Sequence, residues 1–151
     1  VKTVGVTGEF VTGSHGVTVK ADLKPEEISF NNIDGVVLPG GMPGTVNLGK
    51  SETVTKAAVH CAENGKITAA ICAAPSVLGN LGILKGKKAT CFPGFEKELE
   101  GATYTAAPVE IDGNVITGKG AGCAILFGKA IVEKAVSAEA ANKVCGDMQC
   151  P

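Results

Sequence analysis

The chain has 151 residues and a mass of 15.2 kDa, a length typical of one compact domain. Hydrophobic residues make up 44% of it and charged residues 19%, which excludes an intrinsically disordered chain. The net charge is −1 and no basic run occurs, so a nucleic acid or an anionic membrane surface is not an expected partner. The longest uncharged stretch, residues 67–84, contains Pro75 and is barely of spanning length, so we expect no membrane span.

The cysteines indicate neither a disulfide scaffold nor a metal site. The chain has six of them, but it shows no signal-peptide pattern, and its patterned core needs no covalent cross-links. We therefore expect a reducing, cytoplasmic compartment. No C-x-x-C motif occurs, and His15 and His60 lie far apart in the sequence, so we expect no metal and no cofactor.

The first half of the sequence predicts strands separated by glycine-containing turns. Residues 1–7 and 16–20 alternate or run apolar in the manner of strands, with Gly8 as a turn signal between them. Residues 33–38 and 67–71 are short apolar runs of the kind found in buried parallel strands. We predict that both of these runs form interior strands.

Between the two apolar runs, the spacing predicts a helix with one buried face. Ser51 is suited to cap its amino end and Gly65 to end it. The apolar residues recur at the i, i+3, i+4, i+7, i+8 spacing of a helix: Val54, Ala57, Ala58, Cys61 and Ala62.

Strands and helices continue to alternate in the second half, which predicts a mostly parallel sheet between helical layers. We expect Cys145 and Cys150 to lie in a disordered or exposed tail. The predicted elements are a helix at 73–81, a strand at 88–92, a short helix opened by Pro93, a hairpin of 103–111 with 114–117 around Asp112-Gly113, a helix at 121–136, and a helix at 138–144 capped by Ser137.

Cys72 is the residue best placed for chemistry. It ends the apolar run 67–71 and directly precedes a predicted helix, and Ala70 and Ala74 give the small-x-nucleophile-x-small spacing of a nucleophile elbow. The amide groups at a helix amino terminus favour an anion, so they favour the thiolate form of a cysteine placed there. The alternative is an ordinary buried cysteine, since free cysteine is among the most buried residue types.

A glycine-rich loop follows the other predicted interior strand, in the segment LPGGMPG of residues 38–44. In an open parallel sheet, ligands bind beyond the carboxyl ends of the strands, so this loop and Cys72 should face the same crevice. The N–H groups of Gly40 and Gly41, together with that of Ala73, would then point at an oxygen that develops negative charge. The alternative is that the loop is a simple tight turn.

Taken together, these segments resemble the DJ-1/ThiJ/PfpI superfamily over most of the chain. The resemblance implies a flavodoxin-like (class I glutamine amidotransferase-like) three-layer sandwich, usually a homodimer, in which Cys72 is the oxidation-prone cysteine and Gly41 and Ala73 supply backbone donors. Five segments carry it: VVLPGG (36–41), AAICAAP (69–75), TCFPGFE (90–96), GKGAG (118–122) and FGKAIV (127–132).

The sequence departs from the family pattern in three ways. A first strand-helix unit, which carries a glutamate that hydrogen-bonds the cysteine sulfur, has no counterpart, and neither Glu9 nor Glu96 is suitably placed. We therefore expect the chain to be one domain, residues 1–151, that is part of a longer protein, with unpaired edges near residues 33–38. No histidine follows His60 to act as a proton carrier, and Ala73 stands where protease-like members have histidine, which disfavours protease activity.

Two further motifs have alternative interpretations. Residues 113–120 nearly match a phosphate-binding loop, but Gly120 replaces the hydroxyl residue, and residues 114–117 are predicted to form a strand. Cys91 or Cys123 could convert a sulfenic acid on Cys72 into a disulfide. Both cysteines adjoin apolar segments, which favours their being buried core residues.

These features lead to a first hypothesis of a DJ-1-like protein acting in oxidative or carbonyl stress. Its Cys72 would sense oxidants or attack small electrophilic carbonyls, with glyoxalase or deglycase chemistry as one form of that activity. The alternative is a chaperone or interaction module of the same fold without catalysis.

Overall fold

The computed structural model of the chain describes residues 1–150 and contains a central sheet of four strands. Their order across the sheet is β3-β4-β8-β7, and the first three are parallel while β7 runs antiparallel to β8. In this register Leu38 pairs with Ala70 and Ile71 pairs with Gly118, which aligns the carboxyl ends of the parallel strands. The strands span Gly35–Leu38 (β3), Ile67–Ile71 (β4), Val109–Asp112 (β7) and Val115–Gly118 (β8).

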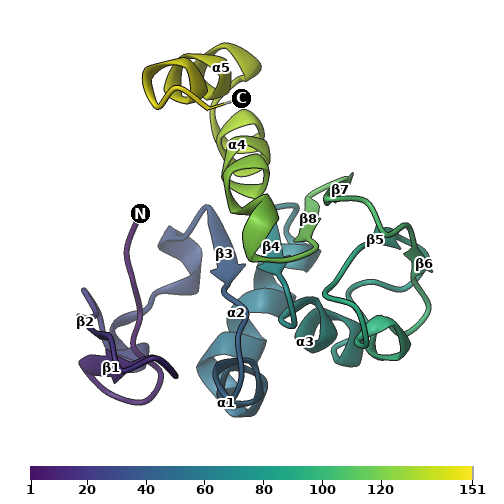
Figure 1. The fold of residues 1–151 in the computed structure, drawn as a ribbon. Helices are drawn as coiled ribbons and strands as arrows, with labels where there is room; N and C mark the ends of the chain where they lie inside the picture. The colour runs from purple at the N-terminus through teal and green to yellow at the C-terminus, as the bar shows by residue number, and fades with distance from the viewer. Residues whose placement is uncertain (151) are drawn as a thin grey trace.

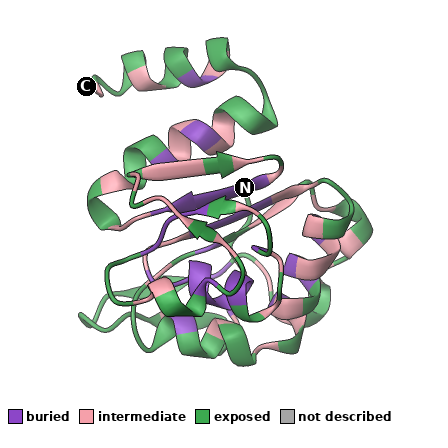
Figure 2. Cartoon of the chain, turned by 90° about the vertical axis from the view of Figure 1, so that its right-hand side faces the viewer, coloured by how far each residue is buried: buried purple, intermediate pink, exposed green. Residues whose placement is uncertain are grey.

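Helices cover both faces of this sheet. α2 and α3 pack on one face, with α1 beside them, and α4 packs on the other face (Figure 1). α5 lies on the outer side of α4, away from the sheet (Figures 1 and 2). This arrangement is the predicted flavodoxin-like three-layer sandwich. The helices span Gly44–Lys50 (α1), Glu52–Glu63 (α2), Pro75–Asn80 (α3), Ala124–Ala135 (α4) and Ala138–Asp147 (α5).

Smaller elements surround the sandwich. An amino-terminal antiparallel hairpin, β1 with β2, is separate from the central sheet, and β5 forms a short parallel pair with β6. These strands span Phe10–Thr12 (β1), Thr18–Lys20 (β2), Lys88–Ala89 (β5) and Thr103–Tyr104 (β6). Short 3₁₀ helices cover Pro25–Glu27, Phe30–Asn32, Glu96–Glu98 and Ala121–Cys123.

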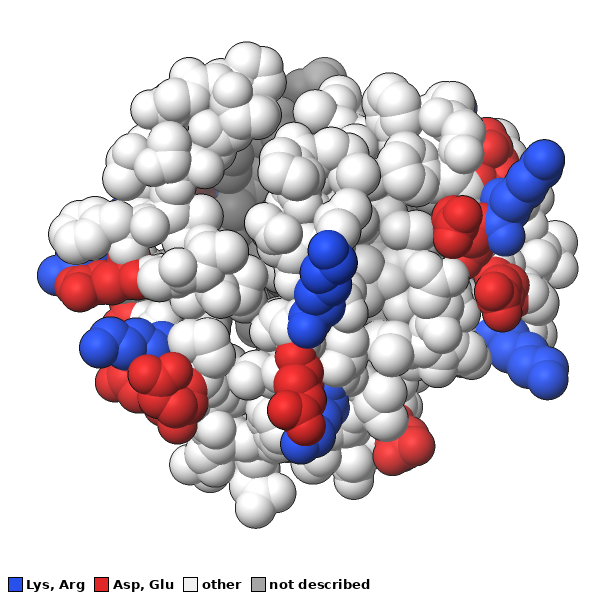
Figure 3. All heavy atoms as spheres, turned by 90° about the horizontal axis from the view of Figure 1, so that it is seen from below, with Lys and Arg blue, Asp and Glu red and all other residues white. Residues whose placement is uncertain are grey.

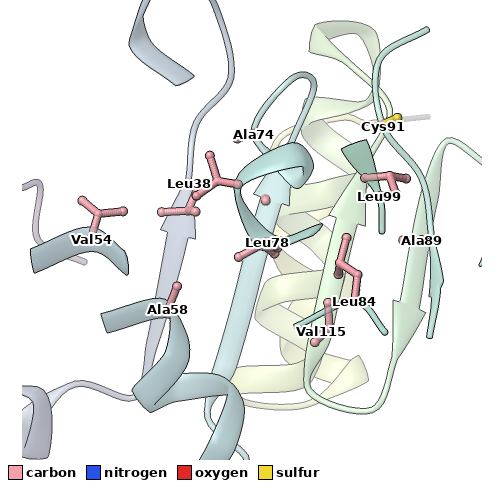
Figure 4. Close-up of a cluster of buried hydrophobic side chains, with 12 residues drawn as sticks. Leu38, Val54, Ala58, Ala74, Leu78, Leu84, Ala89, Cys91, Leu99 and Val115 are labelled. Atoms are coloured by element: carbon pink, nitrogen blue, oxygen red, sulfur yellow. The ribbon is translucent and has the colours of Figure 1, made fainter. Parts of the chain in front are cut away.

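The core has one cluster of apolar side chains on each face of the sheet. β4 contributes to both, because alternate residues of a strand point to opposite faces: Ala70 joins the cluster under α2 and α3, and Ala69 joins the one under α4. Ile116 packs with Phe127 in the second cluster. Figure 4 shows the first cluster, which is formed mainly by Leu38, Val54, Ala58, Ala74, Leu78, Leu84, Ala89, Cys91, Leu99 and Val115.

Local signals in the sequence fix several boundaries as predicted. The Ser51 hydroxyl accepts a hydrogen bond from the Val54 amide at 3.5 Å and begins α2. Ser137 caps α5 in the same manner, through the Ala140 amide at 3.1 Å. Gly113 has φ of +66° in the turn between β7 and β8, which glycine adopts without strain.

The structure corrects the expectations for the amino-terminal third. Residues 1–7 do not form a strand: only an isolated bridge from Val4 to Leu23 is present, and the strand that pairs with β2 is β1. The run 33–38 does not form an interior strand, because β3 pairs with β4 alone among residues 1–150, and Val37 is 47% exposed. Its free edge agrees with the unpaired edge near residues 33–38 that the family resemblance implies. Only β4 of the two predicted interior strands lies inside the sheet.

Several elements of the second half are shorter or more divided than predicted. The strand expected at 88–92 ends at Ala89, and the helix expected after Pro93 is one 3₁₀ turn at 96–98. The predicted strand 103–111 is divided into β6 and β7, because residues 105–108 leave one sheet before joining the other. The helix expected at 121–136 begins with a 3₁₀ turn and becomes α-helical at Ala124.

The carboxyl-terminal segment is also more ordered than expected. α5 continues to Asp147, so Cys145 is helical and Cys150 lies two residues after the helix cap, Met148, and both cysteines are half-buried. No helix among residues 1–150 is long and apolar enough to cross a membrane. On the face seen in Figure 3, basic and acidic side chains are interspersed and form no continuous patch of one sign.

Candidate functional site

Cys72 lies at the corner between β4 and α3 in a left-handed backbone conformation. Its φ is +66°, a region that a non-glycine residue adopts only at a cost of about 1–2 kcal/mol. Two backbone hydrogen bonds hold it there: the Cys72 amide donates to the Gly118 carbonyl, and the Phe92 amide donates to the Cys72 carbonyl, each at 2.8 Å. The corner is therefore fixed by the end of β8 on one side and by the segment after β5 on the other.

The glycine loop after β3 packs directly against this corner. A Cβ atom placed on Gly40 would lie 2.5 Å from the Cys72 Cβ and 2.7 Å from the Ile71 carbonyl oxygen, so only glycine fits. Gly41 follows with φ of +90° and open space on its Cα. The loop and Cys72 thus face one another, as expected for segments at the carboxyl ends of neighbouring parallel strands.

Two backbone amides near the cysteine are free to bind an anion. Within residues 1–150, neither the Gly41 amide nor the Ala73 amide donates a hydrogen bond. The carbonyls of both residues are occupied: Gly41 accepts from the Thr45 amide at 2.8 Å, and Ala73 accepts from the Ser76 hydroxyl at 2.7 Å. The Ala73 N–H shares its peptide unit with the Cys72 carbonyl, which the bond from the Phe92 amide holds in place, and the bonds to the Gly41 and Ala73 carbonyls restrain the peptide units that follow.

Small side chains around the cysteine explain the alanines of the motif. Ala70 and Ala74 have no exposed surface and pack with Leu38 in the first core cluster, where larger side chains would find no room. Cys72 itself is half-buried and retains some exposed surface. α3 begins at Pro75, two residues later than the predicted start at 73, because residues 72–74 form the turn that changes the chain direction.

Phe92 and Gly120 form an apolar part of the surroundings. Phe92 is 47% exposed, and a Cβ on Gly120 would lie 3.4 Å from its ring. Neither residue is expected at the site from its sequence, and the same holds for Gly118, whose carbonyl accepts from the Cys72 amide. The signal that could have indicated Gly118 is the pairing of β8 with β4, because that pairing puts the end of β8 next to the corner.

Cys91 is a core residue with a thiol that resists ionisation. It has no exposed surface, and burial raises the pKa of its thiol to about 11, with the negative charges of Glu96 and Cys72 adding to the effect. Glu96 itself accepts from the Gly94 amide at 2.9 Å, and that hydrogen bond lowers the pKa of its carboxyl group. These features favour the interpretation of Cys91 as a buried core residue.

The remaining candidates do not join the Cys72 corner. His15 is exposed in the hairpin turn. His60 is half-buried beside the Phe30 ring, at 5.9 Å between ring centroids. Glu9 forms a salt bridge with Lys20 at 3.0 Å. Residues 115–118, the centre of the apparent phosphate-binding loop, form the fully buried strand β8.

No metal centre is formed by the described part of the chain. Among residues 1–150, no three His, Cys, Asp or Glu side chains gather closely enough to hold a metal ion. The Cys72 corner itself offers a half-buried thiol near two backbone amides that donate no hydrogen bond within residues 1–150.

Comparison with known proteins identifies the family. The model of the DJ-1/PfpI family matches residues 1–134. The chain is 36% identical over 140 residues to protein DJ-1 homolog B of Arabidopsis thaliana, and 35% identical over 112 residues to the deglycase PfpI of Pyrococcus furiosus. The solved structure of oxidized Toxoplasma gondii DJ-1 superposes with a TM-score of 0.93 at 31% identity. The chain belongs to the DJ-1/PfpI family.

The matched proteins are longer than the chain. The alignment with the Arabidopsis relative covers 91% of this chain and 32% of that protein, and the alignment with the deglycase covers 72% and 66%. The superposition on the Toxoplasma structure covers 99% of this chain and 83% of that one. The chain thus spans about a third of the length of its Arabidopsis relative.

Proposed function

We propose that Cys72 is the reactive nucleophile of a DJ-1-like protein that acts on small electrophilic carbonyls in carbonyl and oxidative stress. The observation that carries the proposal is the left-handed corner at Cys72, packed against Gly40 and flanked by the free amides of Gly41 and Ala73. Similarity to a relative named as a deglycase supports this class of substrate.

In the proposed reaction, the Cys72 sulfur attacks the carbonyl carbon of an aldehyde or ketone. A carbon–sulfur bond forms while the electron pair of the C=O bond moves to the oxygen, which then accepts hydrogen bonds from the Gly41 and Ala73 amides. Because neither His15 nor His60 lies at this corner, water is the proton source that we expect to neutralise the oxygen, giving a hemithioacetal. The adduct can reverse or react onward.

The same arrangement suits an oxidised sulfur. Attack of the thiolate on a peroxide transfers one oxygen to Cys72 and releases an alcohol or water, and further oxidation gives a sulfinate. A sulfinate is an anion with oxygen acceptors, so the two amides that would stabilise a carbonyl oxyanion would also hold it. Reversible carbonyl addition and oxidant sensing thus share one site.

The carbonyl activity is tested by incubating the protein with methylglyoxal and following its loss above the solvent rate. We expect turnover by the unaltered protein, loss of turnover in Cys72→Ser, and unchanged turnover in the matched control Cys123→Ser. Equal rates in Cys72→Ser and the unaltered protein would refute the role of Cys72.

The oxidant-sensing form of the proposal is tested by graded peroxide followed by tryptic mass spectrometry. Cleavage after Lys66 and Lys85 isolates Cys72 as the one cysteine of its peptide, and Cys61 and Cys123 fall in other peptides. We expect Cys72 to gain oxygen at the lowest peroxide concentration. If Cys72 is oxidised no faster than Cys123, the oxidant-sensing form of the proposal is wrong.

A second candidate function is a non-catalytic interaction module or chaperone, favoured by apolar side chains exposed on one side of the sandwich. Val37 on β3 and both Ile125 and Leu126 on α4 are each close to half exposed. Suppression of aggregation that persists unchanged in Cys72→Ser would support this function, and a loss in that variant would exclude it. We also propose a homodimer, which sedimentation at several concentrations would test.

A further inference from the structure

The carboxyl end of α5 closes with a Schellman motif that brings two cysteines together. The Gln149 amide donates to the Gly146 carbonyl at 3.0 Å, and the Cys150 amide donates to the Cys145 carbonyl at 2.9 Å. Gln149 has φ of +53°, the left-handed conformation that this motif requires at the residue after the cap. The chain therefore turns back, and residue 150 lies beside residue 145.

This geometry puts the two cysteines within disulfide range. A hydrogen bond of 2.9 Å between their backbones limits the separation of their Cα atoms to less than about 7 Å, given standard backbone dimensions. Disulfides bridge Cα separations of about 4.4–6.8 Å. The two positions are also those whose side chains regularly contact one another in a Schellman motif.

The two cysteines are free, near each other and only partly buried. Both cysteines are half-buried and unbonded. Partial burial raises the pKa of the Cys150 thiol, and the adjacent Cys145 thiol raises it further, as expected when the two sulfurs are neighbours. Their backbones are also hydrogen-bonded in a fixed register, which holds the two positions close together before any bond forms.

The pair lies apart from the Cys72 corner. α5 packs on the outer side of α4, and α4 separates it from the sheet that carries Cys72 (Figures 1 and 2). Oxidation at α5 would therefore be a second redox event and not a step in the resolution of a sulfenic acid on Cys72.

We propose that Cys145 and Cys150 are a redox modification site, which forms a reversible disulfide by exchange with small-molecule disulfides such as oxidised glutathione. One thiolate of the pair attacks a sulfur of the small disulfide, whose S–S bond breaks and releases one thiol, leaving a mixed disulfide on the protein. The second cysteine then attacks the protein sulfur of that mixed disulfide and releases the second thiol. The two protein sulfurs are oxidised, and the small disulfide is reduced to two thiols.

To test this, the full chain with the substitution Cys72→Ser is equilibrated under anaerobic conditions in mixtures of reduced and oxidised glutathione. The ratio of the two forms of glutathione is varied from one mixture to the next. After acid quenching and alkylation, trypsin cleaves behind Lys143 and gives a peptide that contains both cysteines. We expect this peptide to lose both alkylatable thiols together, in an intramolecular disulfide. Further substitution of Cys145→Ser or Cys150→Ser should leave a stable glutathione adduct on the remaining cysteine.

Stable glutathione adducts at both positions of the Cys72→Ser protein, or disulfide-linked pairs of chains in place of the internal bond, would overturn the proposal. Cys123 is the internal control, because it is a half-buried cysteine for which we propose no partner. It should form a glutathione adduct and no intramolecular bond.

The role of the helix cap is tested at Gln149. Gln149→Gly keeps the left-handed conformation readily, whereas Gln149→Val disfavours it. We expect the equilibrium constant for disulfide formation to be about tenfold lower in Gln149→Val than in Gln149→Gly. Equal constants would show that the cap does not hold the two thiols together. Because the change lies at the end of α5, circular dichroism should show both variants folded.

Discussion

Replacement of Gly40 by alanine is the most direct test of how the Cys72 corner is built. The new Cβ would lie 2.5 Å from the Cys72 Cβ, 2.7 Å from the Ile71 carbonyl oxygen and 3.3 Å from the Ala73 amide nitrogen. Carbon atoms in favourable contact are about 3.5–4.0 Å apart, so the closest pair is short by at least about 1 Å. None of the three opposing atoms can rotate away, because each is fixed by the backbone.

The corner must therefore move, and we expect Gly40→Ala to lower the free energy of unfolding by about 1–3 kcal/mol, the usual cost of overpacking. The shift should also change the surroundings of the sulfur, so the rate at which iodoacetamide alkylates Cys72 should change relative to that of Cys123. Urea unfolding gives the first quantity, and mass spectrometry of the tryptic peptides gives the second.

Gly44→Ala is the matched control, because Gly44 begins α1 close to the same loop and a Cβ there meets no atom within 4 Å. Alanine is the better helix former, so this variant should be as stable as the unaltered protein or more stable by up to about 1 kcal/mol. If the two variants have the same stability and the same Cys72 alkylation rate, the close contact between Gly40 and Cys72 does not shape the corner.

Three further predictions follow from the structure. Because the backbone at Cys72 is left-handed, the free energy of unfolding in urea should be about 1 kcal/mol higher for Cys72→Gly than for Cys72→Ala. The reverse order would show that residue 72 is not strained. Since burial raises the pKa of Cys91 from 9.0 to about 11, the folded state holds this proton more tightly than the unfolded chain, so stability should fall as pH rises through that window. The free energy of unfolding should fall with pH more steeply than in Cys91→Ala, by up to about 1.4 kcal/mol per pH unit. Identical pH profiles of the two proteins would contradict a raised pKa at Cys91. Thr117→Val should lower the free energy of unfolding by about 1–3 kcal/mol, because the buried Thr117 hydroxyl accepts from the Thr90 amide at 2.9 Å. The control Thr90→Val removes a buried hydroxyl that has no hydrogen-bond partner, so it should cost less than about 0.5 kcal/mol. Equal losses of stability in the two variants would exclude this hydrogen bond as the cause.

The sequence predicts the elements that have a regular apolar period and a capping residue. α2 is an example, since its buried face and Ser51 cap both follow from spacing. The corner at Cys72 is also predictable, because a tight turn between a strand and a helix leaves room only for small residues such as Ala70 and Ala74. What these signals share is that they act between residues close in sequence.

Features that depend on distant contacts could not be predicted in this way. The apolar run 33–38 taken alone predicts an interior strand, and the free edge of β3 is expected only from the family pattern, because strand pairing is not encoded in the run itself. His60 lies on the polar side of its helix, and it packs against Phe30, a residue 30 positions earlier in the sequence. The nearness of Cys145 and Cys150 depends on the left-handed Gln149, where the usual glycine signal for a helix end is absent.

The open edge of β3 has a consequence for the behaviour of the chain in concentrated solution. Its four residues, Gly35–Leu38, include neither a proline nor a charged residue such as lysine, which are the residues that protect strand edges against self-pairing. An extended segment of another molecule could continue the hydrogen-bond ladder there and seed ordered precipitation. A lysine introduced at the exposed Val37 would oppose such growth, and it would do so without altering the opposite edge of the sheet.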